Sequence, residues 1–425
     1  MAAERRRPMT KQEYRQMKKM QEKARRQKER EAWEAARGPM DLPFFLLAML
    51  LLTIGLVMLL SASFPSAQAS SNSGYNPLYY FQRQAMWAGL GLFAMFWVSK
   101  INYHRFEGLA KLAMIISIVL LILVILPGPK ANGKLLGITH NGATRWLGIP
   151  GMGTMQFQPS EVAKVGLIVF FAQSISKKRE KMKTFREGFL YHVVILAAMC
   201  ALTMIEPHLS GAILIFGIGA SMLVVGGIHW GWIAAGVASV LGAGYVVLFT
   251  DFMEKVVKYN AARITVWRDP FGGDAAFQRD QAWQTIQSLL TIGSGGLLGV
   301  GLGKSRQKFM FLPEEHNDFI FAVVVEELGL VGAGMIMLLF AMLVIRGFWL
   351  AIRARDRFGS LLVVGVTVQI ALQAFLNMAV VTNLIPNTGI SLPFFSYGGT
   401  ALAIQLAEVG MVLSVSRQIP APRAE

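Results

Sequence analysis

The stretch LPEEHNDFIFAVVVEE, residues 312–327, brings ionisable side chains to the edge of a long apolar run. The run continues to residue 345, and at about 1.5 Å per helical residue it can cross a hydrocarbon layer of about 30 Å. Asp318 is therefore expected at the entrance to a membrane span. Two interpretations of this residue stay open on spacing alone: a functional carboxylate, or a helix N-cap that satisfies free N–H groups.

Glu326 and Glu327 lie inside the same apolar run. Carboxylates within a membrane span are costly unless they face a polar cavity or a partner. We therefore interpret both side chains as functional or structurally paired.

The composition is that of a polytopic membrane protein, and it excludes a soluble multi-domain chain. Apolar residues make up 54% of the 425, charged residues only 16%, and the mean hydropathy is +0.47. The net charge of +16 raises a nucleic-acid hypothesis, but thirteen of the 41 Lys and Arg residues lie between Arg5 and Arg37. Such a tail is typical of a segment held near anionic membrane lipids, so no nucleic-acid partner is expected. The single Cys200 allows no intramolecular disulfide.

Apolar windows predict an all-α fold of ten transmembrane helices. The predicted spans are residues 44–63, 84–99, 109–126, 159–175, 189–205, 209–227, 231–250, 319–345, 360–382 and 400–415. They divide the chain into a basic cytoplasmic tail at 1–42, a membrane domain at 43–417 and a short cytoplasmic tail at 418–425. Within the domain, a large extracytoplasmic loop at 251–318 joins the seventh and eighth helices.

The basic loops predict the orientation. With a cytoplasmic N-terminus, the positive charges fall on the cytoplasmic side, as the positive-inside rule requires. The charges in question are Lys100, Arg105, the run KKREKMKTFR at 177–186, Arg346, Arg353, Arg355 and Arg357. The even number of spans then returns the C-terminus to the cytoplasm.

Two outer loops carry candidate binding residues. The loop at 127–158 contains Arg145 and Trp146 in a stretch that can rest on the membrane interface. Glu161 and Lys164 follow at positions i and i+3 of a helix, where they can form a local ion pair. Whether that pair has a function or is only structural stays open.

The second loop, 251–318, has more cations than an outer loop should carry, and Lys308 is among them. An anionic ligand at the outer leaflet would explain the excess. The run GSGGLLGVGLGKS at 293–305 lacks the spacing of a P-loop. We expect its glycines to allow tight backbone turns near a ligand.

The last outer loop, NLIPNTGISLPFFSYGGT at 383–400, breaks helicity at membrane depth with proline and glycine. Irregular backbone is tolerated there when it lines a protein cavity. Ser396 and Tyr397 can offer hydroxyls to an occupant, although a simple re-entrant turn explains the pattern equally well. His208 and His229 are interpreted as satisfied interface histidines, and no metal-ligand spacing is present.

Six motifs stand in order across the predicted spans: GATRW, FQPSEVAK, RITVWRDP, GGLLGVGLGKSRQK, LPEEHNDFIFAVVVEELGLVG and SLPFFSYGGT. Together they resemble the SEDS family (shape, elongation, division and sporulation), the FtsW/RodA type of peptidoglycan polymerase. The match covers nearly all of residues 44–417, and the N-terminal tail and first outer loop are more similar to the division and sporulation branch. EPHLSGA at 206–212 departs from the Q-P-D-x-G-T of many members, which leaves the role of His208 in doubt, and Asn317 stands where Thr is common.

The resemblance implies an inverting glycosyltransferase that polymerises lipid II into glycan strands at the outer face of the cytoplasmic membrane, at the division septum. The implied partners are lipid II, the nascent glycan strand, a class B penicillin-binding protein, other division proteins and membrane lipids. The implied catalytic residue is Asp318. The candidate substrate-binding residues are Arg145, Trp146, Glu161, Lys164, Lys308, Glu314, His316, Ser396 and Tyr397.

In this mechanism Asp318 activates the 4-hydroxyl of the acceptor sugar, and Arg145 and Lys164 neutralise the leaving pyrophosphate. Like-charge repulsion from Glu314 and Glu315 is expected to raise the pKa of Asp318 toward that of a useful base. A divalent cation, Mg²⁺ or Mn²⁺, is a candidate to assist pyrophosphate departure, but no dedicated ligand set is legible.

Three alternatives stay open at this stage. A transporter that flips lipid II would need the same cations and groove. An elongation polymerase of the RodA type would perform the same chemistry elsewhere in the cell. A non-catalytic scaffold would instead depend on the basic tail.

Overall fold

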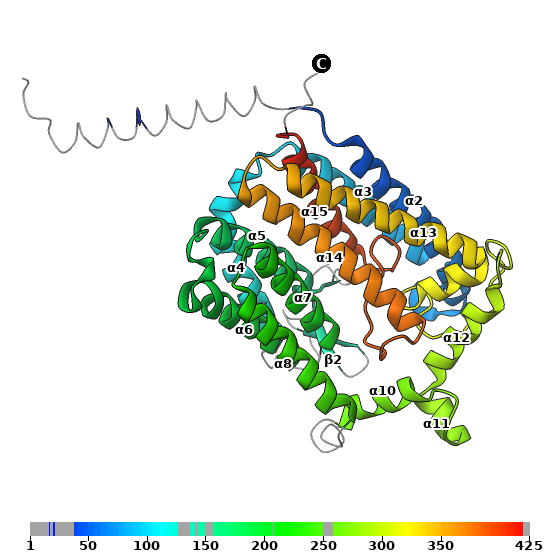
Figure 1. Ribbon diagram of the computed structural model, residues 1–425. Helices are drawn as coiled ribbons and strands as arrows, with labels where there is room; N and C mark the ends of the chain where they lie inside the picture. Colours follow the sequence, from blue (N-terminus) through cyan, green and yellow to red (C-terminus); the bar gives the residue numbers. More distant parts are fainter. Residues whose placement is uncertain are drawn as a thin grey trace, which may run out of the picture.

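The computed structural model describes residues 17, 20, 21, 38–125, 137–140, 143–148, 156–206, 208–249 and 258–419. Most of the predicted tails at 1–42 and 418–425 lies outside these residues. Helices dominate the described chain, as the apolar windows predict (Figure 1). The bounds are α2 (Leu42–Ala69), α3 (Tyr79–Ser99), α4 (His104–Ile125), α5 (Pro159–Lys177), α6 (Tyr191–Ile205), α7 (Leu209–Val225), α8 (Trp230–Phe249), α10 (Lys258–Arg268), α11 (Ala275–Asp280), α12 (Trp283–Gly295), α13 (Ile320–Arg353), α14 (Arg357–Val381) and α15 (Gly399–Ser416).

Each of the ten predicted ranges overlaps a helix, and the chain is a membrane protein by length and apolarity of these elements. Among the described residues, six helical segments are long and apolar enough to cross a membrane: 42–69, 104–125, 185–205, 320–353, 357–381 and 399–416. The segment 185–205 joins a π-helix, Phe185–Leu190, to α6. Helix α7 is apolar but only 17 residues long.

Helices from the two ends of the described chain form one group. Helix α15 lies along α3, while α2 contacts both α3 and α13. A second group forms around α5, which contacts α4, α7 and α14, so that α14 joins the two groups (Figure 1). Burial follows this arrangement, since 72% of the apolar window of α14 is buried, against 28% for that of α4. The core therefore lies around α14.

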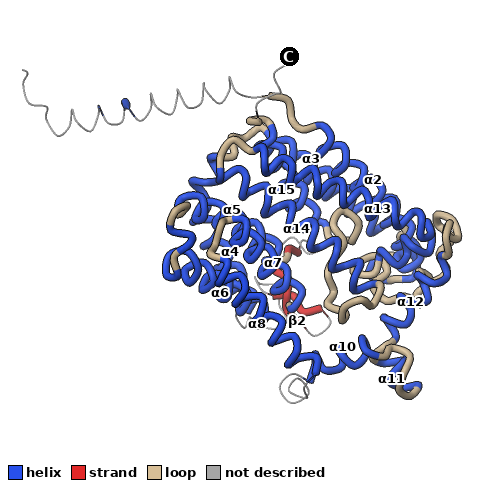
Figure 2. Tube along the Cα trace, viewed as in Figure 1, coloured by secondary structure: helices blue, strands red, loops and turns tan. Residues whose placement is uncertain are grey.

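A small antiparallel sheet was not predicted, so the expectation of an all-α chain is wrong at this point. Three strands lie in the chain segment between α4 and α5 (Figure 2), and they pair in the order β1-β2-β3. They are β1 (Gly137–His140), β2 (Ala143–Gly148) and β3 (Gln156–Phe157). Ile138 is the register partner of Trp146, and Leu147 that of Phe157. The strands contact α4, α5 and α15, so they hold this segment against the helices.

The segment predicted as the large outer loop, 251–318, contains helices of its own. Figure 1 shows α8 leading away from the other helices toward α10 and α11. Helix α12 returns to contact α13 and α14. Trp267 of α10 donates from Nε1 to the carbonyl of Asn383 at 3.2 Å, which ties α10 to the loop between α14 and α15.

Helix α13 is broken at Gly329, whose φ of 70° and ψ of −176° are not helical. The glycine-rich run docks on this break. The amide of Val300 donates to the carbonyl of Glu326 at 2.9 Å, and the amide of Gly301 donates to that of Glu327 at 3.0 Å. Backbone groups that the broken helix leaves unpaired are therefore satisfied by the loop, as burial requires. The glycines allow this close approach to α13, and their expected place near a ligand stays a prediction.

Gly299 and Gly303 provide a matched test of this packing. Their φ angles are 78° and 79°, but a Cβ at Gly299 would lie 2.2 Å from the carbonyl oxygen of Glu327, whereas a Cβ at Gly303 meets nothing within 4 Å. Alanine at either position carries the left-handed backbone penalty of about 1–2 kcal/mol. Gly299→Ala adds a backbone clash of roughly 1–3 kcal/mol.

We therefore expect Gly299→Ala to lower the thermal unfolding midpoint in detergent by clearly more than Gly303→Ala does. Equal midpoints for the two variants would show that the loop does not need this close approach.

Candidate active site

Asp318 lies in the turn that precedes α13, and the loop between α14 and α15 packs beside it. Asn377 of α14 donates from Nδ2 to the backbone carbonyls of Asp318 at 2.7 Å and Ile390 at 2.6 Å. A Cβ added to Gly389 would lie 3.0 Å from Asp318 Oδ2, so the carboxylate rests against this loop. Helix α13 begins at Ile320, and its N-cap position is Phe319 without a side-chain cap bond. The N-cap interpretation of Asp318 is therefore wrong.

The surroundings of Asp318 raise the pKa of its carboxyl group to about 6. Burial is the main cause, because it disfavours the charged form, and the negative charge of Glu314 adds to it. The positive charges of Arg145, His316 and Arg263 act in the opposite direction. Glu315 was also expected to raise the pKa of Asp318. Its Oε1 lies 3.2 Å from His316 Nδ1.

Cations from two distant segments thus act on the carboxyl group through their charge. Arg145 comes from β2, and Arg263 comes from α10, where its Nη1 donates to the carbonyl of Asn387 at 2.8 Å. The first of these was predicted as a substrate-binding residue. Arg263 was recognised only as one of several cations in the outer loop.

Glu206 and His208 form a second part of the site that the sequence did not predict. Both side chains are buried at the turn between α6 and α7. Burial raises the pKa of Glu206 to about 8, while the charge of Arg145 acts against this rise. Burial, together with the charges of Arg145 and Lys164, lowers the pKa of His208 to about 3, so its ring is neutral. Gln158 Nε2 lies 3.3 Å from His208 Nε2.

The predicted pair of Glu161 and Lys164 is confirmed, with Glu161 Oε2 2.9 Å from Lys164 Nζ. The lysine is only 1% exposed. The charges of both residues also act on Glu408 of α15, whose Oε2 accepts a hydrogen bond of 2.7 Å from Gln369 Nε2. Glu408 was missed, although a lone carboxylate within the apolar run 400–415 is a usable signal.

The loop 383–399 uses its side chains within the protein. Ser396 Oγ donates to the carbonyl of Asn317 at 2.7 Å and accepts from the amide of Leu392 at 2.7 Å. The amide of Tyr397 donates to the carbonyl of His316 at 2.9 Å. These bonds hold the turn beside Asp318, and the ring of Tyr80 lies 4.4 Å from that of His316 and 4.9 Å from that of Tyr397.

Trp146 and Glu314 are two further candidate substrate-binding residues. Trp146 is half-buried in β2 next to Arg145. Glu314 has a φ of 56° and accepts a hydrogen bond of 2.6 Å from Asn317 Nδ2. A non-glycine residue with this backbone is strained, and such strain often marks functional segments.

Lys308 lies in a separate polar cluster with Glu327. Its Nζ is 2.8 Å from Glu327 Oε1 and donates to Ser61 Oγ at 3.0 Å, and both charged side chains are nearly inaccessible. Glu326 accepts from the hydroxyl of Ser305 and from the amide of Arg306. Glu327 is thus ion-paired, as one of the two interpretations of these carboxylates predicts, and Glu326 is hydrogen-bonded. A functional role for either carboxylate and a substrate contact for Lys308 stay predictions.

Within the described part of the chain, no group of three or more His, Cys, Asp or Glu residues is placed to hold a metal ion. Of the carboxylates near Asp318, Glu314 accepts a hydrogen bond from Asn317 and Glu315 lies against His316. The arrangement therefore offers a carboxylate of raised pKa beside fixed cations, which suits proton abstraction next to an anionic group.

Comparisons with known proteins agree over nearly the whole chain. The family model FTSW_RODA_SPOVE, described as cell cycle protein, matches residues 41–420. Stage V sporulation protein E of Bacillus subtilis is 38% identical over 378 residues, which cover 89% of this chain and 97% of that protein. The probable peptidoglycan glycosyltransferase FtsW of Geobacter metallireducens is 38% identical over 382 residues, which cover 89% and 95%.

Two solved structures have a similar fold. A chain from a peptidoglycan synthase complex that coordinates polymerization and crosslinking matches with a TM-score of 0.70 and 25% identity, covering 89% of this chain and 98% of that chain. The rod shape determining protein RodA of Thermus thermophilus matches with a TM-score of 0.62 and 26% identity, covering 90% and 98%.

The buried pair of Lys308 and Glu327 leads to a stability prediction. Lys308→Met leaves the carboxylate of Glu327 buried without a counter-charge, which should destabilise the protein by about 3–5 kcal/mol. Adding Glu327→Gln removes the unpaired charge, so the double variant should regain most of the loss. Thermal unfolding in detergent measures both, with Lys304→Met at an exposed position as the control. An equal loss in the single and double variants would contradict this account of the pair.

Proposed function

The chain belongs to the FTSW_RODA_SPOVE family of cell cycle proteins, and on that premise we propose that it polymerises lipid II during septal wall synthesis. It is a peptidoglycan glycosyltransferase, as its relatives' names indicate. A membrane domain suits this activity because the substrate is a lipid-linked sugar. The observation that carries the proposal for the site is the buried carboxyl group of Asp318, whose pKa is raised to about 6 and on which the charges of Arg145 and Arg263 act from two other segments.

We propose ten membrane spans, formed by α2 to α8 and α13 to α15, with both termini in the cytoplasm. The positive loops of the sequence support this orientation. It places Asp318, β2 and α10 to α12 at the outer face of the cytoplasmic membrane, so the septal wall would be made there.

Asp318 acts in this proposal as the general base. Its carboxylate accepts the proton of the 4-hydroxyl on the acceptor sugar as the oxygen attacks the anomeric carbon of the growing chain. The bond to the pyrophosphate breaks on the opposite face, which inverts the anomeric centre. A base with a pKa near 6 is largely deprotonated at neutral pH and still able to take up a proton.

Cations would stabilise the departing pyrophosphate. Arg145 is suited to bind two phosphate oxygens at once because its guanidinium is a planar fork. Lys164 would act as a point charge held in place by Glu161. Glu206 and His208 would act near Arg145 without cancelling its charge, since their pKa shifts favour neutral forms.

Aromatic and polar side chains around the turn would bind the sugars. Trp146, His316 and Tyr397 would supply ring surfaces, and Glu314 would raise the pKa of the base, Asp318. Ser396 contributes by holding the turn at Asn317. A divalent cation at the pyrophosphate remains compatible with this scheme.

We also propose a cross-linking partner of the class B penicillin-binding protein type, together with other division proteins. The similar chain in a complex that coordinates polymerization and crosslinking supports this pairing. A RodA-like role in elongation is the alternative, because the similarity to RodA extends over 90% of the chain.

A transporter is the alternative from another class, and the break in α13 bears on it. In transporters, broken helices expose backbone groups to the substrate. Here the carbonyls of Glu326 and Glu327 at the break accept amides of the glycine-rich run. Because the glycine-rich run already binds these carbonyls, the break favours the polymerase over the transporter.

Asp318→Asn should abolish polymerisation and leave folding intact, because the amide has the same shape but cannot accept the proton. We would assay purified lipid II in detergent with and without a cognate class B penicillin-binding protein, and read glycan ladders on a gel. Asp274→Asn at the exposed N-cap of α11 is the matched control and should retain activity. Ladders from the Asp318 variant would remove the residue from the chemistry.

The pH dependence of the polymerisation rate should follow the protonation of the Asp318 carboxyl group. The rate should fall as the pH drops through about 6, because protonation removes the base. Glu314→Gln takes away a negative charge that raises the pKa of Asp318. The acid limb of the pH–rate profile, where the rate falls, should therefore move to lower pH. Glu315→Gln is the control and should leave the limb in place, since Glu315 lies against His316. An unshifted limb in Glu314→Gln would contradict the assigned coupling.

A further inference from the structure

The segment 297–311 presents an apolar surface that packing within the protein leaves open. Large exposed apolar side chains follow one another along it, with Leu298 80% and Met310 73% accessible. The others are Leu297, Val300, Leu302, Phe309 and Phe311. Clustered exposed apolar residues mark a contact with a partner or a membrane.

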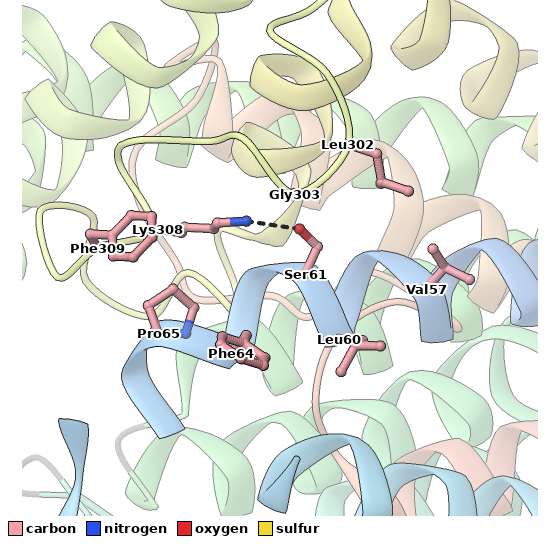
Figure 3. A pocket seen from close by; sticks show the side chains of 9 residues that line it. All are labelled: Val57, Leu60, Ser61, Phe64, Pro65, Leu302, Gly303, Lys308 and Phe309. Atoms are coloured by element: carbon pink, nitrogen blue, oxygen red, sulfur yellow. Dashed lines mark hydrogen bonds between the residues drawn. The ribbon is translucent and has the colours of Figure 1, made fainter. Parts of the chain in front are cut away.

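This surface borders an open pocket of about 440 Å³. Its walls are Val57, Leu60 and Phe64 of α2, and Leu302 and Phe309 of the segment 297–311, as Figure 3 shows. The pocket walls are thus mostly hydrocarbon, and they come from two parts of the chain some 240 residues apart in the sequence.

The polar floor of the pocket is already satisfied. Lys308 Nζ bonds Ser61 Oγ at 3.0 Å (Figure 3) and lies 2.8 Å from Glu327 Oε1. The buried ammonium is therefore neutralised by the protein. A charged group is not required in the pocket itself, so an apolar chain suits it.

The position of the pocket along α2 points to the lipid bilayer. Its residues lie in the C-terminal half of a helix that is long and apolar enough to span a membrane. In the proposed orientation this half crosses the outer leaflet. An apolar pocket that opens on hydrocarbon takes up a lipid chain rather than water.

Two exposed cations stand next to the pocket. Lys304 and Arg306 follow the lining residue Gly303, and both side chains are exposed. The aliphatic part of Lys304 folds over Gly301, with Cδ 3.3 Å from the position of a Cβ there. Exposed cations beside an apolar pocket complement a lipid phosphate.

We propose that this pocket binds one anionic phospholipid of the outer leaflet, with an acyl chain between α2 and the segment 297–311 and the phosphate at Lys304 and Arg306. The site goes beyond the proposed function, because none of the groups that act on Asp318 lines the pocket. The bound lipid holds the segment that leads, nine residues after Phe309, to Asp318.

Native mass spectrometry of the purified full chain tests the site. Phosphatidylglycerol and phosphatidylcholine are offered at equal concentration in detergent, and the retained lipid is counted. The wild type should retain one phosphatidylglycerol in preference to phosphatidylcholine. Lys304→Gln with Arg306→Gln should weaken retention about fivefold for each charge, hence about 25-fold. Val57→Trp should fill the pocket and abolish retention.

Matched controls separate the site from general effects. Leu50→Trp places the same ring on an exposed position of α2 outside the pocket, and Arg268→Gln with Arg279→Gln removes two other outer-loop charges; both should bind as wild type. If Val57→Trp fails to fold, the charge variant still decides, since its side chains are exposed.

Three results would overturn the proposal. They are equal retention of the two lipids, unchanged retention in the charge variant, and displacement of phosphatidylglycerol by equimolar undecaprenyl phosphate. The last would assign the pocket to a polyprenyl chain. Lipid counting needs no catalysis, so failure of the proposed enzymatic function leaves this test unaffected.

Discussion

The break in α13 and the glycine-rich run that fills it are the constraint on which the outer half of the molecule depends. Within a membrane every backbone polar group needs a protein partner. Two carbonyls at the break accept amides of residues 300 and 301, and the side chains of the same two glutamates bind the segment 305–308. One helix break therefore anchors, through a buried backbone contact, the stretch that leads to Asp318.

The candidate site limits its buried charge because burial keeps some ionisable groups neutral: the pKa of Glu206 is raised to about 8 and that of His208 is lowered to about 3. Arg145 lies among carboxyl groups and a neutral histidine, and Lys164 lies between Glu161 and Glu408. Removing Lys164 would leave the carboxylate of Glu161 without its counter-charge, which is costlier than the intact pair. The same low-dielectric surroundings raise the pKa of Asp318 into the range useful to a base. Burial is thus the shared cause of the charge pattern in the candidate site and of the raised pKa of Asp318.

The outer segment between α8 and α13 has two faces with separate chemistry. One face, through Arg263 and the turn at Asp318, meets the loop between α14 and α15. The other presents Leu302 and Phe309 toward α2. A lipid on the second face and a sugar at the first would act on one continuous stretch of chain.

The sequence by itself determined the helices, the membrane character and the Glu161–Lys164 pair, because apolar length and i, i+3 spacing are local properties. It also located Asp318 at the start of α13. Only the tertiary structure decided that Glu206, His208 and Glu408 join the site, that Ser396 bonds Asn317, and that Lys308 neutralises Glu327. Each of these contacts joins segments far apart in the chain or a turn to its neighbours in space, and such partners follow from packing, which no local pattern encodes.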